Sequence, residues 1–196
     1  AQDITDAAFS HVIGMLTPEM TELEVAAELE YAMRRGGAEG ISFDTIAVSG
    51  KNSSLPHGVP TDKPLENGDF LTMDFGAVFE GYCSDMTRTV ALGYVTDNQQ
   101  EIYDIVLQAQ LEALKNIKPN IRCKEIDKIA RDIIANKGYG EFFGHGLGHS
   151  VGIEIHENPS FNTRDETTLK KGMVLTVEPG IYLPDKFGVR IEDMVV

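Results

Sequence analysis

The feature that most constrains the fold is an internal duplication. The segment GDFLTMDFG at 68–76 aligns without gaps with GMVLTVEPG at 172–180, and this alignment matches Asp74 to Glu178. The arms that follow also align, and they match Asp85 to Glu192. Upstream, TPEMTELEVAAELEYAMRRGG aligns with KPNIRCKEIDKIARDIIANKG. Three matches in the same order predict two copies of one unit, roughly 1–95 and 96–196.

Each copy contains the pattern of two helices followed by a β-hairpin. We expect helices at 3–16, 21–36, 98–116 and 122–137, a strand at 43–49, a polar loop at 49–69, and hairpins near 70–92 and 173–196. These elements predict a single α+β domain over 1–196. Its two helix–helix–β-hairpin halves would be related by pseudo-symmetry around a curved antiparallel sheet.

Four acidic residues occupy equivalent positions in the two predicted hairpins. A turn at 79–80 would set Asp74 opposite Asp85, whereas a turn at 80–81 would shift the partner by two residues. Both turns keep the two acids on one face of the sheet. Acids on an exposed sheet edge remain the alternative, but buried carboxylates that face one another need a shared proton or a cation. Because Glu178 and Glu192 repeat the arrangement, we expect two divalent ions about 3.5–4 Å apart with a bridging hydroxide.

The segment GHGLGHSVGIEIHE at 144–157 holds three of the five histidines. His145 and His149 have the spacing of a helical zinc motif, but each of the three glycines among them would cost a helix about 1 kcal/mol. The Glu that follows the first His of a zincin helix is also absent. We therefore expect a bent loop, in which glycine allows close approach to a ligand, and then a strand at 151–156 that returns His156 to the site.

Composition excludes some classes of partner. The net charge is −14, from 17 Lys and Arg against 31 Asp and Glu, which argues against a nucleic-acid partner. No apolar run approaches the roughly 20 residues that a membrane span requires, and no secretory signal is recognisable at the start. Cys83 and Cys123 form no CxxC motif, so we expect reduced thiols in a cytoplasmic protein.

Five motifs in order resemble one known family: LPHG, MDFGAVFEGYCSDMTRT, GHGLGHSVGIEIHE, VEPGIY and GVRIEDMVV. They are similar to the pita-bread metallopeptidases, in the Xaa-Pro branch that contains aminopeptidase P and Xaa-Pro dipeptidase (prolidase). The similarity covers essentially the whole chain. It implies the pita-bread fold and a dinuclear-metal exopeptidase that hydrolyses the Xaa-Pro bond of dipeptides, or of small peptides with proline at position two. An oxygen-rich ligand set favours Mn²⁺, with Co²⁺, Fe²⁺ or Zn²⁺ as alternatives.

The resemblance also implies the metal ligands. Asp74 would bind one metal in bidentate fashion, His149 and Glu178 would complete the coordination of the other, and Asp85 and Glu192 would bridge both. Glu178 would also take the proton from the bridging water.

The same resemblance assigns roles around the substrate. His57 matches the histidine near the leaving proline nitrogen, and His156 matches the one that contacts the substrate carbonyl and its oxyanion. His145 would line the substrate pocket, and Arg190 would support the bridging Glu and the far end of the substrate. Tyr182 and Thr87 would hold these groups in place.

Two other functions stay open at this point. A methionine aminopeptidase-like enzyme shares the five ligands and a GHG stretch, although VEPGIY and GVRIED favour the Xaa-Pro branch. A non-catalytic binding module on the same fold is disfavoured by the intact ligand set. Xaa-Pro enzymes usually carry an N-terminal domain that this chain lacks, so we expect a catalytic domain alone, and a homodimer only in a full-length protein.

Overall fold

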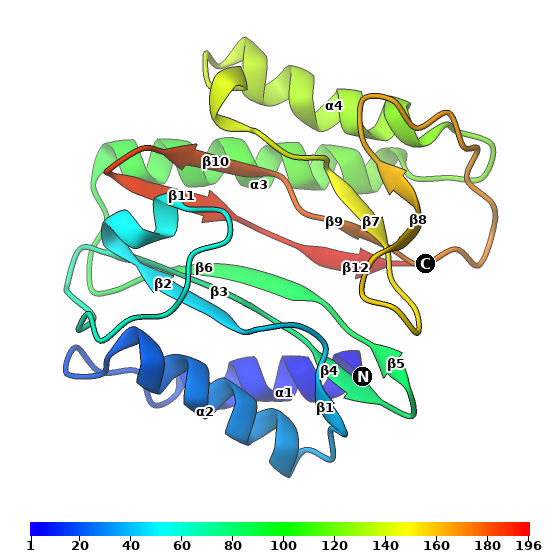
Figure 1. The fold of residues 1–196 in the computed structure, drawn as a ribbon. Helices are drawn as coiled ribbons and strands as arrows, with labels where there is room; N and C mark the ends of the chain where they lie inside the picture. The colour runs from blue at the N-terminus through cyan, green and yellow to red at the C-terminus, as the bar shows by residue number, and fades with distance from the viewer.

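The computed structural model describes residues 1–196 and contains the four predicted helices, within three residues of their expected ends. Helix α1 (Gln2–Ile13) packs against α2 (Glu22–Arg35), and α3 (Asp97–Asn116) packs against α4 (Cys123–Asn136). Figure 1 shows one helix pair on each side of the strands. Helices α2 and α3 each begin at a threonine capping box, which satisfies backbone N–H groups at the helix start.

The first half builds two small sheets from its strands. One sheet has the strand order β2–β3–β6. The other has the order β1–β4–β5 and contains the end of the hairpin. The strands are β1 (Gly40–Ile41), β2 (Ile46–Ser49), β3 (Phe70–Phe75), β4 (Ala77–Phe79), β5 (Tyr82–Cys83) and β6 (Met86–Ala91), with a short 3-10 helix η1 (Gly50–Ser54) after β2.

The register of the first hairpin resolves the alternative left open by the sequence. Phe79 pairs with Tyr82, so the turn lies at Glu80–Gly81, and Asp74 pairs with Thr87 instead of Asp85. Both turn residues have positive φ, 51° and 76°, which is the conformation of a type I′ hairpin turn. Asp85 lies outside the paired strands, between β5 and β6.

The second half repeats this plan with a second hairpin. A four-stranded sheet has the order β12–β9–β7–β8, and β10 pairs with β11. The strands are β7 (Gly148–Ser150), β8 (Glu157–Phe161), β9 (Leu175–Val177), β10 (Gly180–Leu183), β11 (Phe187–Arg190) and β12 (Asp193–Val195), with a 3-10 turn η2 (Gly140–Phe142) before β7.

The expected strand at 151–156 was wrong. Strand β7 ends at Ser150, and residues 151–156 form bends before β8 begins at Glu157. The pairing of β7 with β8 shifts register after His149, and the Gly152 carbonyl accepts a hydrogen bond from Cys83 N–H of β5 (2.8 Å). The alternation of apolar residues was misleading because Ile153 is 68% exposed instead of facing the core.

Each helix pair covers its own apolar core. One cluster of 14 buried residues lies between α1, α2 and the first sheet, and one of 21 lies between α3, α4 and the second. The halves are joined along their strands by polar contacts: Glu192 N–H donates to the Thr87 carbonyl (3.1 Å), and Thr89 Oγ1 donates to the Arg190 carbonyl (2.9 Å). None of the helices combines the length and the apolar character that a membrane crossing demands.

Candidate metal centre and active site

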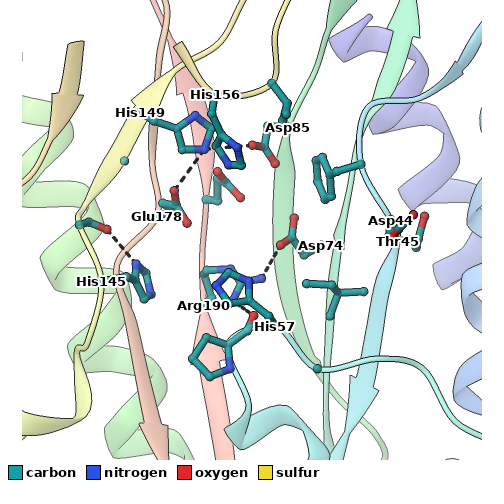
Figure 2. A pocket seen from close by; sticks show the side chains of 18 of the residues that line it. Asp44, Thr45, His57, Asp74, Asp85, His145, His149, His156, Glu178 and Arg190 are labelled. Atoms are coloured by element: carbon teal, nitrogen blue, oxygen red, sulfur yellow. Dashed lines mark hydrogen bonds and ion pairs between the residues drawn. The ribbon is translucent and has the colours of Figure 1, made fainter. Parts of the chain in front are cut away.

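One pocket has a volume of about 740 Å³, which is a usual size for a small-ligand site. It is lined by residues of both halves. Figure 2 shows its side chains, which come from the strands and from the loops beside them. The pocket collects nine of the sequence-predicted residues: His57, Asp74, Asp85, His145, His149, His156, Glu178, Arg190 and Glu192. Tyr182 and Thr87 lie behind the lining and contact it through hydrogen bonds.

Three of the four acids sit at breaks between hairpin strands, and Asp74 is the next-to-last residue of its strand. Asp74 projects from β3 and Asp85 directly precedes β6. Glu178 separates β9 from β10, and Glu192 separates β11 from β12. The pairing of β10 with β11 and that of β9 with β12 share one register, so Glu178 lies opposite Glu192. The duplicated hairpins therefore bring all four carboxylates to one place.

Burial of these four carboxylates destabilises their ionised forms when no cation is bound. Asp85 is 5% exposed and Glu192 is 1% exposed. Burial, followed by the neighbouring charges of Glu192, Asp74 and Glu178, raises the pKa of Asp85 well above its usual range. Burial and the charge of Glu192 raise the pKa of Glu178 in the same direction. Burial and the charge of Asp74 raise the pKa of Glu192 to about 7.

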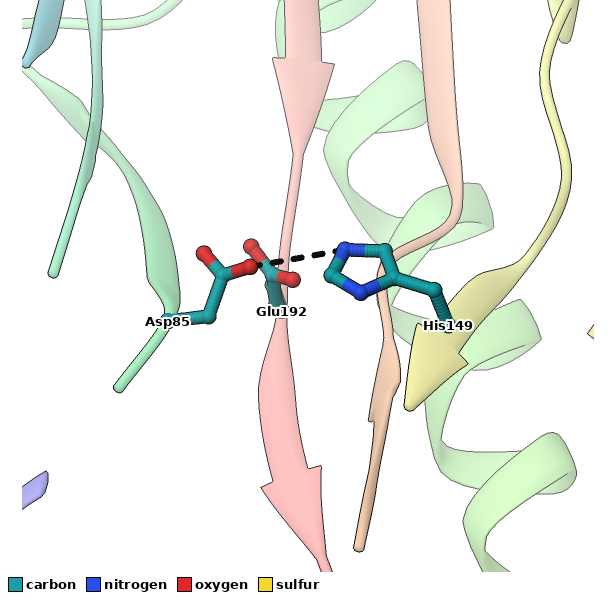
Figure 3. Close-up of side chains that lie close together, drawn as sticks. All are labelled: Asp85, His149 and Glu192. Carbon is teal, nitrogen blue, oxygen red and sulfur yellow. Dashed lines mark ion pairs between the residues drawn. The ribbon is translucent and has the colours of Figure 1, made fainter. Parts of the chain in front are cut away.

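His149 completes the cluster from strand β7. Its Nδ1 faces the Ser150 carbonyl at 3.1 Å, which makes Nδ1 the protonated nitrogen and leaves the lone pair on Nε2. Nε2 lies 3.5 Å from both Asp85 Oδ2 and Glu178 Oε1, too far for a good hydrogen bond. Ligand atoms of Asp85, His149 and Glu192 lie within 4.8 Å of one another. Figure 3 shows these three side chains from close by.

These residues fit divalent cations. Asp74 Oδ1 and Glu192 Oε1 are buried and have no hydrogen-bond partner in the protein, which is costly unless a cation or water satisfies them. Among the four carboxylates, only that of Asp74 contacts a guanidinium directly, the one of Arg190. Four carboxylates and one imidazole form an oxygen-rich ligand set that suits harder metal ions.

Arg190 organises one wall of the pocket. It is 4% exposed, and it donates from Nη2 to Asp74 Oδ2, from Nε to Thr87 Oγ1 (3.0 Å) and from Nη1 to the Tyr182 hydroxyl (2.9 Å). Thr87 Oγ1 in turn donates to Glu192 Oε2 at 2.6 Å. Arg190 therefore reaches the predicted bridging Glu through Thr87, while its direct acidic partner is Asp74.

His145 has protein partners on both ring nitrogens. Nδ1 faces the Gly146 carbonyl at 2.8 Å and Nε2 faces the Tyr182 hydroxyl at 2.9 Å. Burial lowers the pKa of His145 to about 4, so the ring is neutral, with Nδ1 as donor and Nε2 as acceptor from Tyr182. His145 therefore offers a substrate its ring surface and C–H edge, since neither nitrogen is free.

The two remaining histidines lie on loops at the pocket. The ring of His156 packs edge-on against that of His149, with centroids 4.5 Å apart. His57 follows η1, and its predecessor Pro56 accepts a hydrogen bond from Arg190 Nη1 at 3.1 Å. Both rings therefore line the pocket that contains the acid cluster, as Figure 2 shows.

Comparison with known proteins identifies the family of this arrangement. The model of metallopeptidase family M24 matches residues 1–196. The chain belongs to metallopeptidase family M24. It is 52% identical over 196 residues to the Xaa-Pro dipeptidase of Pyrococcus horikoshii, covering 100% of this chain and 56% of that protein.

Solved structures of M24 members have the same fold. A Xaa-Pro dipeptidase from Bacillus anthracis superposes with a TM-score of 0.98 at 52% identity, covering 100% of this chain and 55% of that one. An X-Pro aminopeptidase from Thermotoga maritima gives a TM-score of 0.96 at 50% identity, covering 99% and 55%. The expected pita-bread fold and the expected family are confirmed, and this chain spans about half the length of these relatives.

Two glycines of this M24 chain line the pocket and also lie against neighbouring backbone, and their close approach to a ligand stays a prediction. None of the three glycines at 144–148 has a positive φ. A Cβ on Gly148 would lie 2.0 Å from the Thr176 carbonyl oxygen, and one on Gly146 would lie 2.8 Å from the Phe161 carbonyl oxygen. Gly146 and Gly148 therefore allow close approach of neighbouring backbone, which sets the position of His149 on β7.

One buried ion pair behind the pocket was missed by the sequence analysis. Asp127 on α4 is fully buried, and it pairs with Arg131 and accepts the Leu147 N–H at 3.1 Å. Arg131 also donates to the carbonyls of Phe143 (3.1 Å) and His145 (2.7 Å). The available signal was the Asp–Arg spacing of four residues on a predicted helix.

Proposed function

We propose that this chain is a dinuclear metallopeptidase that hydrolyses the Xaa-Pro bond in dipeptides or at the N-terminus of small peptides. Membership of family M24 and similarity to proteins named Xaa-Pro dipeptidase support the reaction class. The observation that carries the proposal is the convergence of four carboxylates and the free Nε2 of one imidazole in a single pocket. Residues 1–196 would act as one catalytic domain.

The proposed metal ligands are Asp74, Asp85, His149, Glu178 and Glu192. Two divalent ions held there, for which Mn²⁺ is our first choice, would polarise the scissile carbonyl and lower the pKa of an attacking water molecule. The negative charge of the cluster also suits the free amino terminus of a peptide, which places the residue before proline nearest the acids.

The remaining chemistry falls to side chains around this centre. Glu178 would accept the proton of the attacking water, a role that suits a carboxylate whose pKa burial has raised. His156, beside His149, would donate to the carbonyl oxygen as negative charge develops on it. His57 would serve the departing proline nitrogen, which has no proton of its own in the peptide. The linked side chains of Arg190, Tyr182 and His145 would form the wall that holds the substrate.

Hydrolysis assays test the proposal directly. We expect the protein to cleave Xaa-Pro dipeptides and Xaa-Pro-containing peptides in preference to Xaa-Ala and Met-Ala peptides, with loss of activity in a chelator and recovery with Mn²⁺. Asp85→Ala should lower kcat/KM by about 100- to 1,000-fold. Asp104→Ala, which removes an exposed acid on α3, should leave it unchanged. Preference for Met-Ala peptides, or full activity of Asp85→Ala, would refute the assignment.

Cellular location and assembly complete the proposal. Cys83 and Cys123 are both free, which supports a reducing cytoplasmic location. The expected homodimer of a full-length protein rests on the family resemblance, and light scattering coupled to size exclusion tests it.

A further inference from the structure

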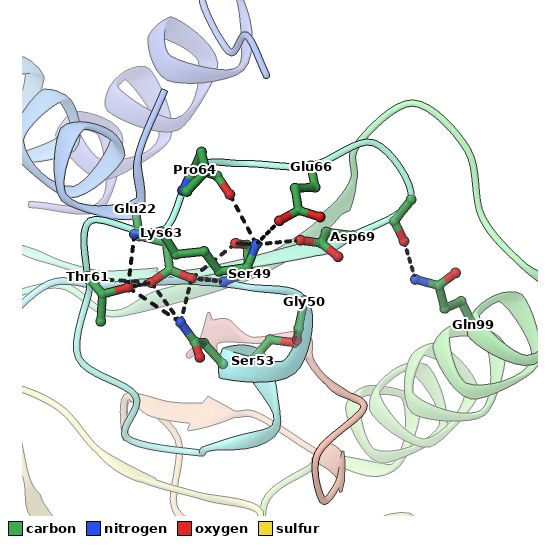
Figure 4. Close-up of polar contacts among 12 residues, drawn as sticks. Glu22, Ser49, Gly50, Ser53, Thr61, Lys63, Pro64, Glu66, Asp69 and Gln99 are labelled. Atoms are coloured by element: carbon green, nitrogen blue, oxygen red, sulfur yellow. Dashed lines mark hydrogen bonds and ion pairs between the residues drawn. The ribbon is translucent and has the colours of Figure 1, made fainter. Parts of the chain in front are cut away.

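A second buried carboxylate lies outside the metal centre and has no role in the chemistry above. Glu22 is the first residue of α2 and is fully buried. Its Oε1 accepts hydrogen bonds from Ser49 N–H (2.6 Å), Ser49 Oγ (3.0 Å) and Asn52 Nδ2 (3.1 Å). Its Oε2 accepts from Asn52 Nδ2 (3.1 Å), Thr61 N–H (3.1 Å) and Thr61 Oγ1 (2.7 Å). Figure 4 shows this network.

These partners flank one segment of the chain. Ser49 and Asn52 precede His57 and Thr61 follows it, so one carboxylate ties together both ends of the segment 49–61. Lys63 reinforces the tie, because its Nζ donates to Ser49 Oγ (3.0 Å) and to Asp69 Oδ2 (2.7 Å).

Apolar packing does little to order the tip of this segment. Leu55 is 59% exposed and Val59 is 76% exposed, and His57 between them is exposed as well. A loop with so little buried apolar surface opens easily unless polar contacts fix it. Beyond Glu22, the tip is held from the opposite side by Arg190, which donates to the Pro56 carbonyl, and by Ser53, which accepts the Gly188 N–H at 2.9 Å.

The other half of the molecule shows that the fold itself does not need this carboxylate. At the start of α2, the N–H groups of Glu22 and Leu23 donate to the carbonyls of Lys63 (3.1 Å) and Thr61 (3.0 Å). The start of α4 repeats these contacts, with Cys123 N–H donating to Thr167 (2.9 Å) and Lys124 N–H donating to Asp165 (2.9 Å). A cysteine occupies the position of Glu22 in that half, so the shared backbone scaffold forms without an acid.

We infer that Glu22 is a positioning residue, which holds the segment 49–61 so that His57 stays at the pocket for the leaving proline nitrogen. The inference rests on the proposed function for the role of His57. Every partner of the Glu22 side chain is a hydrogen-bond donor, and a carboxylate is purely an acceptor. Glu22→Gln keeps the size of the side chain but turns one acceptor into a donor that faces other donors. It therefore releases one end of the segment without opening a cavity.

The test compares Glu22→Gln with Glu24→Gln in the full chain with saturating Mn²⁺. Glu24 lies on the same helix, is exposed and bonds only within its capping box, so its variant removes the same charge without touching the loop. We expect Glu22→Gln to lower kcat/KM for Xaa-Pro substrates by about ten- to a hundredfold, as a displaced group near the reaction does. The metal content should stay unchanged, and Glu24→Gln should stay within roughly twofold of the parent protein.

A double-variant cycle separates positioning from general damage. In a His57→Gln background, adding Glu22→Gln should cause almost no further loss, because the residue it positions is already gone. Multiplicative losses in the double variant, or a Glu22→Gln enzyme within roughly twofold of the parent, would overturn the inference. Loss of metal together with activity would overturn it as well. If Glu22→Gln does not fold, Thr61→Val removes one donor to the carboxylate. It should lower kcat/KM in the same direction, and an unchanged value refutes the inference.

Two further measurements do not depend on catalytic activity. In Glu22→Gln, hydrogen exchange at the Ser49 and Thr61 amides should accelerate, and the His57 ring signals in an NMR spectrum with only five histidines should shift or broaden. Absence of Xaa-Pro hydrolysis by the parent protein would refute the proposed function alone, since these two measurements still decide whether Glu22 holds His57 in place. Unchanged exchange and unchanged His57 signals would refute the inference about Glu22.

Discussion

Glu192→Gln is expected to make the metal-free protein more stable, although it removes a proposed metal ligand. Glu192 is 1% exposed, and burial together with the charge of Asp74 raises its pKa to about 7 from 4.5. Between those two values the folded protein binds a proton that the unfolded chain has released, so the free energy of unfolding falls as the pH rises. The destabilisation is absent below about pH 4.5 and complete above about pH 7.

The size of the effect follows from that shift. A raise from 4.5 to about 7 corresponds to about 3 kcal/mol at pH 8, at about 1.4 kcal/mol for each pKa unit. A glutamine retains an oxygen that accepts from Thr87 Oγ1 but carries no charge. The metal-free variant should therefore gain up to about 3 kcal/mol at pH 8, or about 6–12 °C in Tm for a chain of this length, and almost nothing at pH 4.5.

Thermal melts in a chelator at pH 4.5 and pH 8 measure this difference, with Glu19→Gln as an exposed control that should change Tm little. Saturating Mn²⁺ should reverse the order, because the parent protein gains binding free energy that the variant loses. If metal-free Glu192→Gln melts below the parent protein at pH 8, the claim that the ionised Glu192 carboxylate destabilises the metal-free fold is refuted.

Two further substitutions test the supports of the site. Gly148→Ala should cost about 1–3 kcal/mol of stability and weaken Mn²⁺ binding, because its Cβ would meet neighbouring backbone. Gly144→Ala, where a Cβ meets nothing within 4 Å, should melt like the parent, and equal losses in both would contradict the packing argument. Tyr182→Phe removes the hydroxyl that faces His145 Nε2 and should lower stability by about 1–2 kcal/mol in urea unfolding. Tyr31→Phe is its exposed control, and equal unfolding curves for both variants would refute the claimed hydrogen bond.

Much of the fold could be predicted because the duplication restricts it. Matching Asp74 to Glu178 and Asp85 to Glu192 anticipated that hairpins from both halves meet at the acids, and the structure has them lining one pocket. The turn of the first hairpin could not be predicted, because two-residue turns at 79–80 and 80–81 both fit the pattern. The positive φ of Glu80, unusual for a residue other than glycine, is a property of the folded hairpin.

Other features depend on contacts that local sequence does not encode. The alternation in VGIEIH is typical of a strand, but hydrogen bonding of Gly152 to Cys83 draws the backbone out of the β7–β8 pairing. Glu22 could not be distinguished from an ordinary acid at a helix start, because its partners Ser49 and Thr61 lie far along the chain. Burial and long-range hydrogen bonds, which only the structure provides, reveal it as a support of the site.

The most direct test of the central claim is the metal content of the protein purified without chelators. Elemental analysis should find two divalent ions in each chain, and Asp85→Ala or Glu192→Gln should hold fewer. Added Mn²⁺ should raise the Tm of the chelator-treated parent protein in proportion to the logarithm of its concentration. A parent chain that holds no divalent ion, and whose Tm does not change on addition of Mn²⁺, would contradict the account.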